Sequence, residues 1–148
     1  RRTLAEVDLL VINDSEARQL AGEDNLVKAA AAVRAMGPKT LIVKRGEFGA
    51  AAFSNRSTFA VPAMLLESVL DPTGAGDSFA GGLMGYLASH ASDGPISEGM
   101  LRRGIAMGSV MASFTVQSFG VEGLLDLNRE LIDRRYGEFG SLSRIDEG

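Results

Sequence analysis

The chain has 148 residues, of which 45% are hydrophobic, and its 15 Lys and Arg residues against 19 Asp and Glu residues give a net charge of −4. This length and this mixture of charges predict one globular domain over residues 1–148 and exclude a mainly disordered chain. A weakly acidic chain with two Tyr, no Trp and no Cys also lacks the basic, aromatic surface that binds nucleic acid, and it excludes disulfides and thiolate metal sites.

The first part of the chain contains two apolar segments separated by helical signals. Residues 7–12 (Val-Asp-Leu-Leu-Val-Ile) and 40–44 (Thr-Leu-Ile-Val-Lys) have the nearly continuous pattern of strands that are buried on both faces of a parallel sheet. Between them, the sequence predicts two helices, over residues 14–20 and 26–36, each closed by a glycine.

The rest of the chain is expected to form a hairpin and then mostly helix. A glycine turn over residues 45–49 leads into the hairpin, whose strands are 50–54 and 57–61. Apolar residues at helical spacing then predict three helices, over residues 78–89, 96–116 and 124–136, followed by a frayed tail over 137–148. Strands that alternate with helices indicate a three-layer α/β/α fold with a mostly parallel sheet.

Residues 73–77 (Thr-Gly-Ala-Gly-Asp) carry the strongest chemical signal, a glycine loop that opens a helix. Glycines let backbone amides converge where the helix dipole already favours an anion, so a phosphate group can bind there. Asp77 lies in the first turn, where its carboxylate can accept the proton of an attacking hydroxyl group. The alternative is a tight turn in which Asp71 or Thr73 caps the helix and Asp77 complements the dipole.

Three motifs resemble those of the PfkB (ribokinase-like) carbohydrate kinases. Residues 71–82 (Asp-Pro-Thr-Gly-Ala-Gly-Asp-Ser-Phe-Ala-Gly-Gly) are similar to the C-terminal signature of that family. An Asn-x-x-Glu motif at residues 13–16 and a Lys-x-Gly-x-x-Gly motif at residues 44–49 precede it in the family's order. The resemblance covers residues 7 to 125 and corresponds to the C-terminal half of such a kinase, without the acceptor-binding half and the lid.

This resemblance implies a ribokinase-like fold, in its C-terminal portion only, and ATP-dependent transfer of the γ-phosphate to a hydroxymethyl group of a sugar or nucleoside. Asp77 matches the catalytic base of the family, and Gly74, Ala75 and Gly76 match its anion hole. Phosphoryl transfer asks a protein mainly for positioning and charge stabilisation, which agrees with the chemistry of the glycine loop.

The resemblance also implies metal sites. Asn13 and Glu16 match a motif that helps to organise Mg²⁺ and phosphate, with mostly water-mediated contacts, at the edge where open α/β sheets bind ligands. The alternative is that Asn13 caps the following helix and Glu16 is a first-turn carboxylate. Asp71 and Thr73 match a loop that in some relatives helps to bind a monovalent cation such as K⁺ beside the anion hole.

The remaining nucleotide contacts are expected from two other segments. Lys44 at a strand end can reach a nucleotide phosphate, and Gly46 and Gly49 let the backbone of the turn approach it closely. An ordinary glycine turn with a solvated lysine is the alternative. Ser109 lies where relatives place residues that contact the purine, although small residues at helical spacing also indicate helix packing.

We therefore expect the nucleotide-binding half of a PfkB-type kinase, with ATP and a small sugar or nucleoside as partners. The alternatives are a non-enzymatic nucleotide-binding or interaction module and a kinase of a vitamin precursor. No stretch approaches the roughly 18 apolar residues of a membrane helix, so we expect a cytoplasmic protein without a membrane partner. A homodimer of the full-length parent is a further expectation, and the acceptor is left open.

Overall fold

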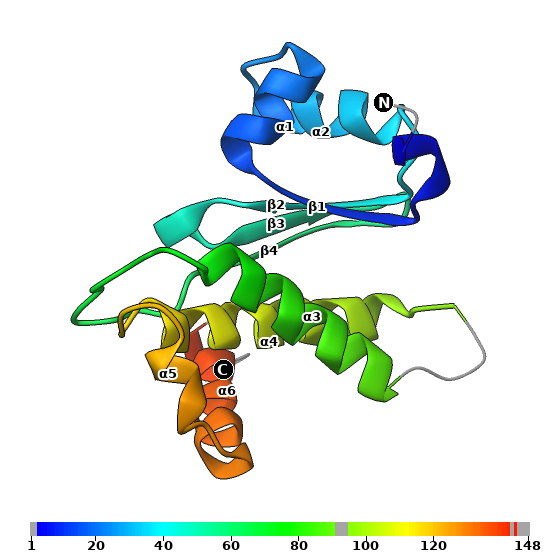
Figure 1. Ribbon diagram of the computed structural model, residues 1–148. Coiled ribbons are helices and arrows are strands. Elements are labelled where there is room, and N and C mark those ends of the chain that lie inside the picture. The colour runs from blue at the N-terminus through cyan, green and yellow to red at the C-terminus, as the bar shows by residue number, and fades with distance from the viewer. Residues whose placement is uncertain (1–2, 91–94, 143, 145–148) are drawn as a thin grey trace. The chain divides into compact units, whose positions relative to one another are not determined.

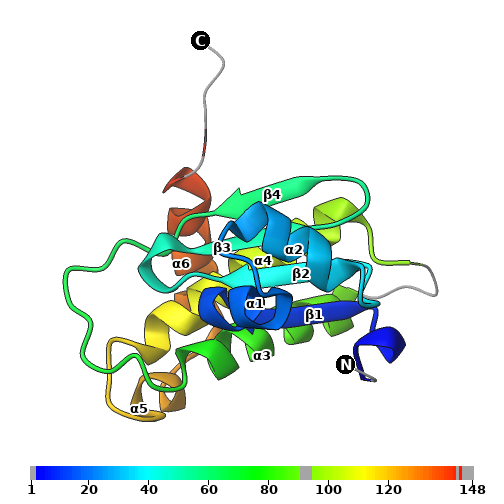
Figure 2. The same cartoon turned by 90° about the horizontal axis from the view of Figure 1, so that it is seen from above.

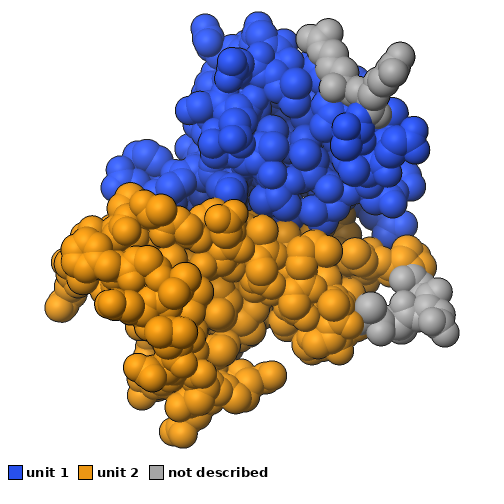
Figure 3. Space-filling view, in the orientation of Figure 1, with its two compact units in different colours: residues 1–60 blue, residues 61–148 orange. Residues whose placement is uncertain are grey.

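The computed structural model describes residues 3–90, 95–142 and 144. The chain divides into two compact units, unit 1 over residues 1–60 and unit 2 over residues 61–148 (Figure 3). The assignment of one domain to the whole chain stays a prediction.

Unit 1 is built on a four-stranded sheet with the strand order β1-β2-β3-β4 (Figure 1). Its strands are β1 (Leu9–Asn13), β2 (Thr40–Lys44), β3 (Ala50–Phe53) and β4 (Thr58–Val61), the last of which ends at the boundary between the units. β1 pairs with β2 in parallel, and β2 pairs with β3 antiparallel. The sheet is therefore mixed where a mostly parallel sheet was expected, because the short turn after β2 can join only antiparallel neighbours.

Two helices cover one face of this sheet, as Figure 2 shows from above. They are α1 (Asp14–Ala21) and α2 (Leu26–Arg34), and single-turn 3₁₀ helices occur at Thr3–Glu6 and Gly46–Phe48. Alanines on the inner faces of the helices let them approach the β-branched and aromatic side chains of the strands. The buried cluster consists of Ala17, Ala30, Val33, Leu41, Val43, Ala51 and Phe53.

Unit 2 is helical in its described part. An irregular segment leads into α3 (Ala75–His90), followed by α4 (Glu98–Thr115), α5 (Glu122–Leu125) and α6 (Arg129–Leu142). The α3 and α4 helices pack closely because glycines lie at their contact. An ideal Cβ at Gly82 would lie 2.9 Å from the Met107 carbonyl oxygen, and one at Gly108 would lie 2.7 Å from the Phe79 carbonyl oxygen.

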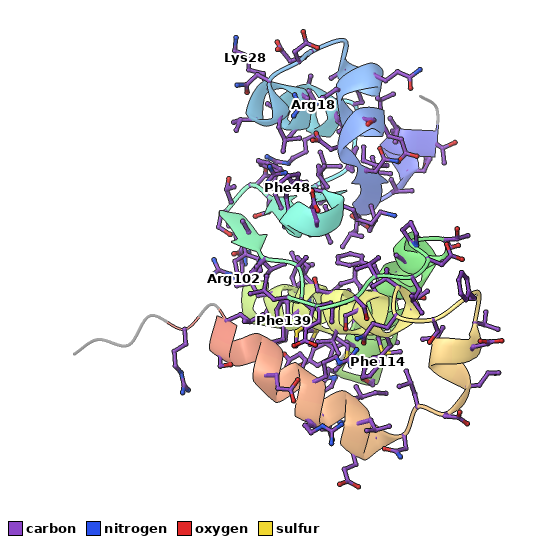
Figure 4. The ribbon with its side chains drawn as sticks, turned by 90° about the vertical axis from the view of Figure 1, so that its left-hand side faces the viewer. Arg18, Lys28, Phe48, Arg102, Phe114 and Phe139 are labelled. Carbon is purple, nitrogen blue, oxygen red and sulfur yellow. The ribbon has the colours of Figure 1, made fainter. Side chains whose placement is uncertain are left out.

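The C-terminal segment differs from the sequence prediction. One helix was expected over residues 124–136, but the chain breaks between α5 and α6, where Asn128 Oδ1 accepts a hydrogen bond from the Leu131 amide at 3.0 Å. The frayed tail expected from residue 137 is also wrong as far as residue 142, because α6 continues and Phe139 is only 2% exposed. Figure 4 shows Phe139 on α6 and Phe114 on α4, whose ring lies 3.7 Å from the guanidinium carbon of Arg135.

None of the helices in the described ranges is long and apolar enough to cross a membrane.

Candidate functional site

The segment before α3 folds into a turn that its own residues hold in place. Asp71 Oδ1 accepts a hydrogen bond from the Thr73 amide at 2.9 Å. The Ala75 amide donates to the Pro72 carbonyl oxygen at 3.2 Å. Gly74 lies between them with a φ of 81°, a left-handed backbone conformation that residues with a side chain rarely adopt. The turn therefore depends on glycine at position 74.

The first turn of α3 leaves backbone amides free. Among the hydrogen bonds of the residues that the structure describes, none is donated by the amides of Gly74, Gly76 or Asp77. Gly74 directly precedes the helix and has no side chain with which to cap it. Because α3 is 16 residues long, its dipole adds partial positive charge at this end. Free amides at the positive end of a helix form an arrangement that can hold a phosphate oxygen.

A pocket of about 410 Å³ lies at this helix start, entirely within unit 2. The turn before α3, the end of α4 and the segment after α4 line it. Its lining residues are Thr73, Gly74, Asp77, Ser78, Thr115, Gly120, Val121 and Leu124. Polar residues at the start of α3 thus meet the apolar side chains of Val121 and Leu124 there, and the surface turned toward the pocket is mostly apolar.

Two carboxylates flank the turn. Hydrogen bonds from the side chain and the backbone of Thr73, helped by one from the Gly120 backbone, hold the pKa of Asp71 below its usual value despite a small opposing effect of burial. Asp71 is therefore ionised at neutral pH and ties the turn to the segment after α4. Asp77 lines the pocket and is exposed, so its carboxylate is accessible to a substrate.

In unit 1, the start of α1 is closed by its own side chains. Asn13 Oδ1 accepts a hydrogen bond from the Glu16 amide, and Glu16 Oε2 accepts one from the Asn13 amide, both at 2.8 Å. This reciprocal arrangement is a capping box. Asn13 therefore caps α1 and Glu16 is a first-turn carboxylate, which is the alternative that the sequence left open for these residues. Their role toward Mg²⁺ stays a prediction, for which the second carboxylate oxygen of Glu16 and solvent are available.

Lys44 lies beside this cap. It is the register partner of Asn13 across the parallel pair of β1 and β2, so both residues lie at the same sheet edge. The turn that follows places Gly46 at φ 57° and Gly49 at φ 83°, conformations that favour glycine at both positions. The Arg45 amide donates to the Gly49 carbonyl oxygen at 2.7 Å and closes the turn.

Arg45 is a residue that the sequence analysis missed in this turn. Its Nε atom is buried and has no hydrogen-bond partner in the described part of the chain, and its guanidinium carbon lies 5.9 Å from the centre of the Phe48 ring. The only signal in the sequence is a second basic residue directly after Lys44 at a strand end.

Ser109 on α4 retains only 8% of its surface. Its neighbour Gly108 packs against Phe79 of α3, so this stretch of α4 contributes to the interior of unit 2. These contacts favour the packing role of the small residues, and a purine contact by Ser109 stays a prediction.

The structure thus brings the predicted residues together in two separate groups. In unit 2, Thr73, Gly74 and Asp77 line the pocket, and Asp71 is bonded to Thr73. In unit 1, Asn13, Glu16 and Lys44 share a sheet edge. Sequence reasoning missed Thr115 and the segment from Gly120 to Leu124, because nothing in their local pattern indicates that the end of α4 returns to the start of α3.

The described residues contain no group of three or more His, Asp or Glu side chains that could hold a metal ion. Mg²⁺ in phosphoryl-transfer sites is held by one or two carboxylates together with the phosphates of the substrate. The donor set of this chain therefore fits a metal ion that arrives with a nucleotide rather than a metal ion held by the protein alone.

The family model of the pfkB family carbohydrate kinases matches residues 1–126 of this chain. The chain therefore belongs to this family. Among curated proteins it is similar to a cytidine kinase of Thermococcus kodakarensis, with 32% identity over 100 residues that cover 66% of this chain and 34% of the relative.

Solved structures show the same fold. Aminoimidazole riboside kinase from Salmonella enterica, complexed with aminoimidazole riboside and an ATP analogue, has a TM-score of 0.80 and 24% identity, covering 91% of this chain and 44% of the other. Fructokinase from Vibrio cholerae, bound to fructose, ADP and a calcium ion, has a TM-score of 0.80 and 18% identity over 91% and 42% of the two chains. The fold is ribokinase-like α/β, and this chain spans less than half the length of these relatives.

Proposed function

We propose that this chain is the nucleotide-binding part of an ATP-dependent kinase that transfers the γ-phosphate to a hydroxymethyl group of a small sugar or nucleoside. The observation that carries the proposal is the start of α3, where three free amides, a dipole of 16 residues and the carboxylate of Asp77 meet at one pocket. Membership of the PfkB family supports phosphoryl transfer. The names of the relatives support a sugar or nucleoside acceptor without selecting one.

Each part of this helix start has a task in such a reaction. The amides of Gly74, Gly76 and Asp77 hold phosphoryl oxygens and stabilise the negative charge that develops on them during transfer. The Ala75 amide already donates to the Pro72 carbonyl oxygen, so Ala75 contributes to the anion hole through the shape of the turn. Asp77 orients the acceptor hydroxyl group and accepts its proton, which is the work of a general base.

The proposal also assigns roles to metal ions and to the residues at the sheet edge of unit 1. Mg²⁺, when bound with ATP, neutralises charge on the phosphates. Asn13 and Glu16 would contact its water ligands while they keep the α1 cap closed, and Lys44 at the same sheet edge would pair with a phosphate oxygen. Gly46 and Gly49 shape that turn for close approach. Asp71, ionised and joined to Thr73, is the candidate for a monovalent cation such as K⁺.

The experiment that tests the proposal replaces Asp77 by Asn in the complete gene product that carries this chain. With ATP and a panel of cytidine, fructose and ribose as acceptors, Asp77→Asn should lower kcat by at least about 10²-fold and leave the KM for ATP nearly unchanged. Asp133→Asn on α6 is the matched control, because it loses one exposed carboxylate whose pairing with Arg129 contributes little. A kcat of Asp77→Asn within a few-fold of wild type would show that Asp77 is not the general base and only complements the helix dipole.

A second candidate is a nucleotide-binding module without turnover. The observation that favours it is the start of α3, whose free amides can hold a phosphate group whether or not transfer follows. ADP binding without phosphoryl transfer to any acceptor, including vitamin precursors that carry a hydroxymethyl group, would favour this candidate over the kinase.

A further inference from the structure

The two hydroxyl groups of Thr115 and Ser78 form a contact between α4 and the first turn of α3 that no motif accounts for. Thr115 is the last residue of α4 and is only 2% exposed, and its Oγ1 donates to Ser78 Oγ at 2.6 Å. The residues are 37 positions apart, so the bond joins the two helices at the pocket that both residues line.

The direction of this hydrogen bond follows from the available acceptors. The Thr115 hydroxyl group has one proton, and the Met111 carbonyl oxygen, its other acceptor, is 3.4 Å away. Thr115 is almost fully buried and its other acceptor lies near the limit of hydrogen-bond distance, so its proton is best satisfied by Ser78 Oγ. Ser78 Oγ therefore accepts from Thr115, and its own proton remains available. Within the described residues, the Ser78 hydroxyl group donates to no other side chain or carbonyl group.

Thr115 also lies close to the turn that precedes Ser78. Its Cγ2 methyl group would lie 3.6 Å from a Cβ at position 74, so Thr115 lies next to the turn and also bonds Ser78. The Ser78 amide donates to the Gly74 carbonyl oxygen at 2.9 Å, which links the three residues at the start of α3.

We propose that Thr115 is a positioning residue for the bound phosphate: it holds the Ser78 hydroxyl group so that the Ser78 proton is donated into the pocket at the start of α3. This inference rests on the proposed function, because it needs a phosphate group in that pocket. It adds one side-chain donor to the free amides of Gly74, Gly76 and Asp77. A buried threonine that only joins two helices would stabilise unit 2 without any effect on an anion.

The test measures binding of inorganic tripolyphosphate and of ADP to the complete gene product by calorimetry, beside thermal melts. Loss of one hydrogen bond to a charged group predicts that Thr115→Val and Ser78→Ala each raise the Kd for tripolyphosphate about tenfold. Because both changes remove the same bond to the phosphate, the double variant should have about the same Kd as either single variant. Thr115→Ser keeps the hydroxyl group and should stay within about twofold of wild type.

Ser113→Ala is the matched control. Ser113 is also a buried hydroxyl residue of α4, but it donates to the Val110 carbonyl oxygen and accepts from Arg135 of α6. This variant should lose stability and keep the wild-type Kd. If Thr115→Val does not fold, Ser78→Ala decides the question.

The outcomes separate the two proposals. If the wild-type protein binds neither tripolyphosphate nor ADP, the proposed function fails and the role of Thr115 falls with it. If the wild-type protein binds both and the Thr115→Val or Ser78→Ala variant binds as tightly, the positioning role is overturned and the proposed function stands.

Discussion

The starts of α1 and α3 differ in how their unpaired backbone amides are satisfied. Each helix begins with amides that have no partner inside the helix and with a carboxylate in its first turn. In α1, Asn13 and Glu16 satisfy each other's backbone amides through a capping box. In α3, Gly74 precedes the helix without a side chain, and the amides of Gly76 and Asp77 remain free.

The two helix starts therefore differ in whether their backbone amides stabilise the fold or remain available to a ligand. The capping box uses the amides of Asn13 and Glu16, which stabilises the start of α1 without a ligand and leaves a phosphate fewer free amides than the start of α3 does. A helix start that follows a glycine turn gives up the cap, which typically contributes about 1 kcal/mol, and keeps its donors for an anion. The first-turn carboxylates differ accordingly: Glu16 binds the backbone, whereas Asp77 lies exposed at a pocket.

Adding a side chain at the free helix start should produce the largest effect. Gly76→Val places a branched side chain next to the free amides, and we expect phosphoryl transfer by the complete gene product to fall at least about 10²-fold, with a melting temperature near that of wild type. Gly85→Val is the matched control on the same helix, because an ideal Cβ there meets nothing within 4 Å. Full activity of Gly76→Val would mean that the phosphate binds elsewhere.

The glycines in the middle of α3 should behave differently from those at its start. Gly82→Ala should destabilise the protein by about 1–3 kcal/mol, because the added carbon lies 2.7 Å from Met111 Cγ and 2.9 Å from the Met107 carbonyl oxygen. Gly81→Ala next to it enters open space and should stabilise the helix by about 0.5–1 kcal/mol. Urea denaturation of both variants measures these changes. Equal stabilities would contradict the close packing of α3 on α4.

Removing the cap of α1 should have the smallest effect. Asn13→Ala should lower the free energy of unfolding by about 1 kcal/mol. Asn25→Ala is the control, because Asn25 Oδ1 caps α2 by accepting from the amides of Val27 and Lys28. Denaturation should show similar losses for the two variants. An Asn13→Ala variant that keeps full stability and loses nucleotide binding would show that Asn13 acts in ligand binding and not as a helix cap.

Much of the fold could be predicted from local patterns. The strands at 40–44 and 50–54 and the helix that begins at residue 26 lie within one or two residues of the predicted bounds, because buried apolar runs, glycines and an Asn cap act locally. The break between α5 and α6 was missed because apolar spacing continues across it, while Asn128 restarts the helix. The hairpin was expected, but the antiparallel pairing of β2 with β3 was not stated, since strand direction depends on turn length rather than on strand composition.

The candidate site divides in the same way. The glycine turn at Gly74 was predicted, and the Asn13 cap was given as an alternative, because each needs only neighbouring residues. Thr115 could not be found, because its partner Ser78 is 37 positions away and only the packing of α4 on α3 brings them together.

The most direct test of the account compares the two helix starts within one sample. The backbone amide resonances of the ¹⁵N-labelled chain are followed by NMR while Mg²⁺ and ADP are added up to millimolar concentrations, so that weak binding is also detected. The account predicts that the resonances of Gly76, Asp77 and Ser78 move on saturation, while those of Asn13 and Glu16, already bonded within the cap, move little. Saturable shifts that leave the start of α3 unchanged, or no shifts in a folded sample, would contradict the claim that this helix start holds the phosphate.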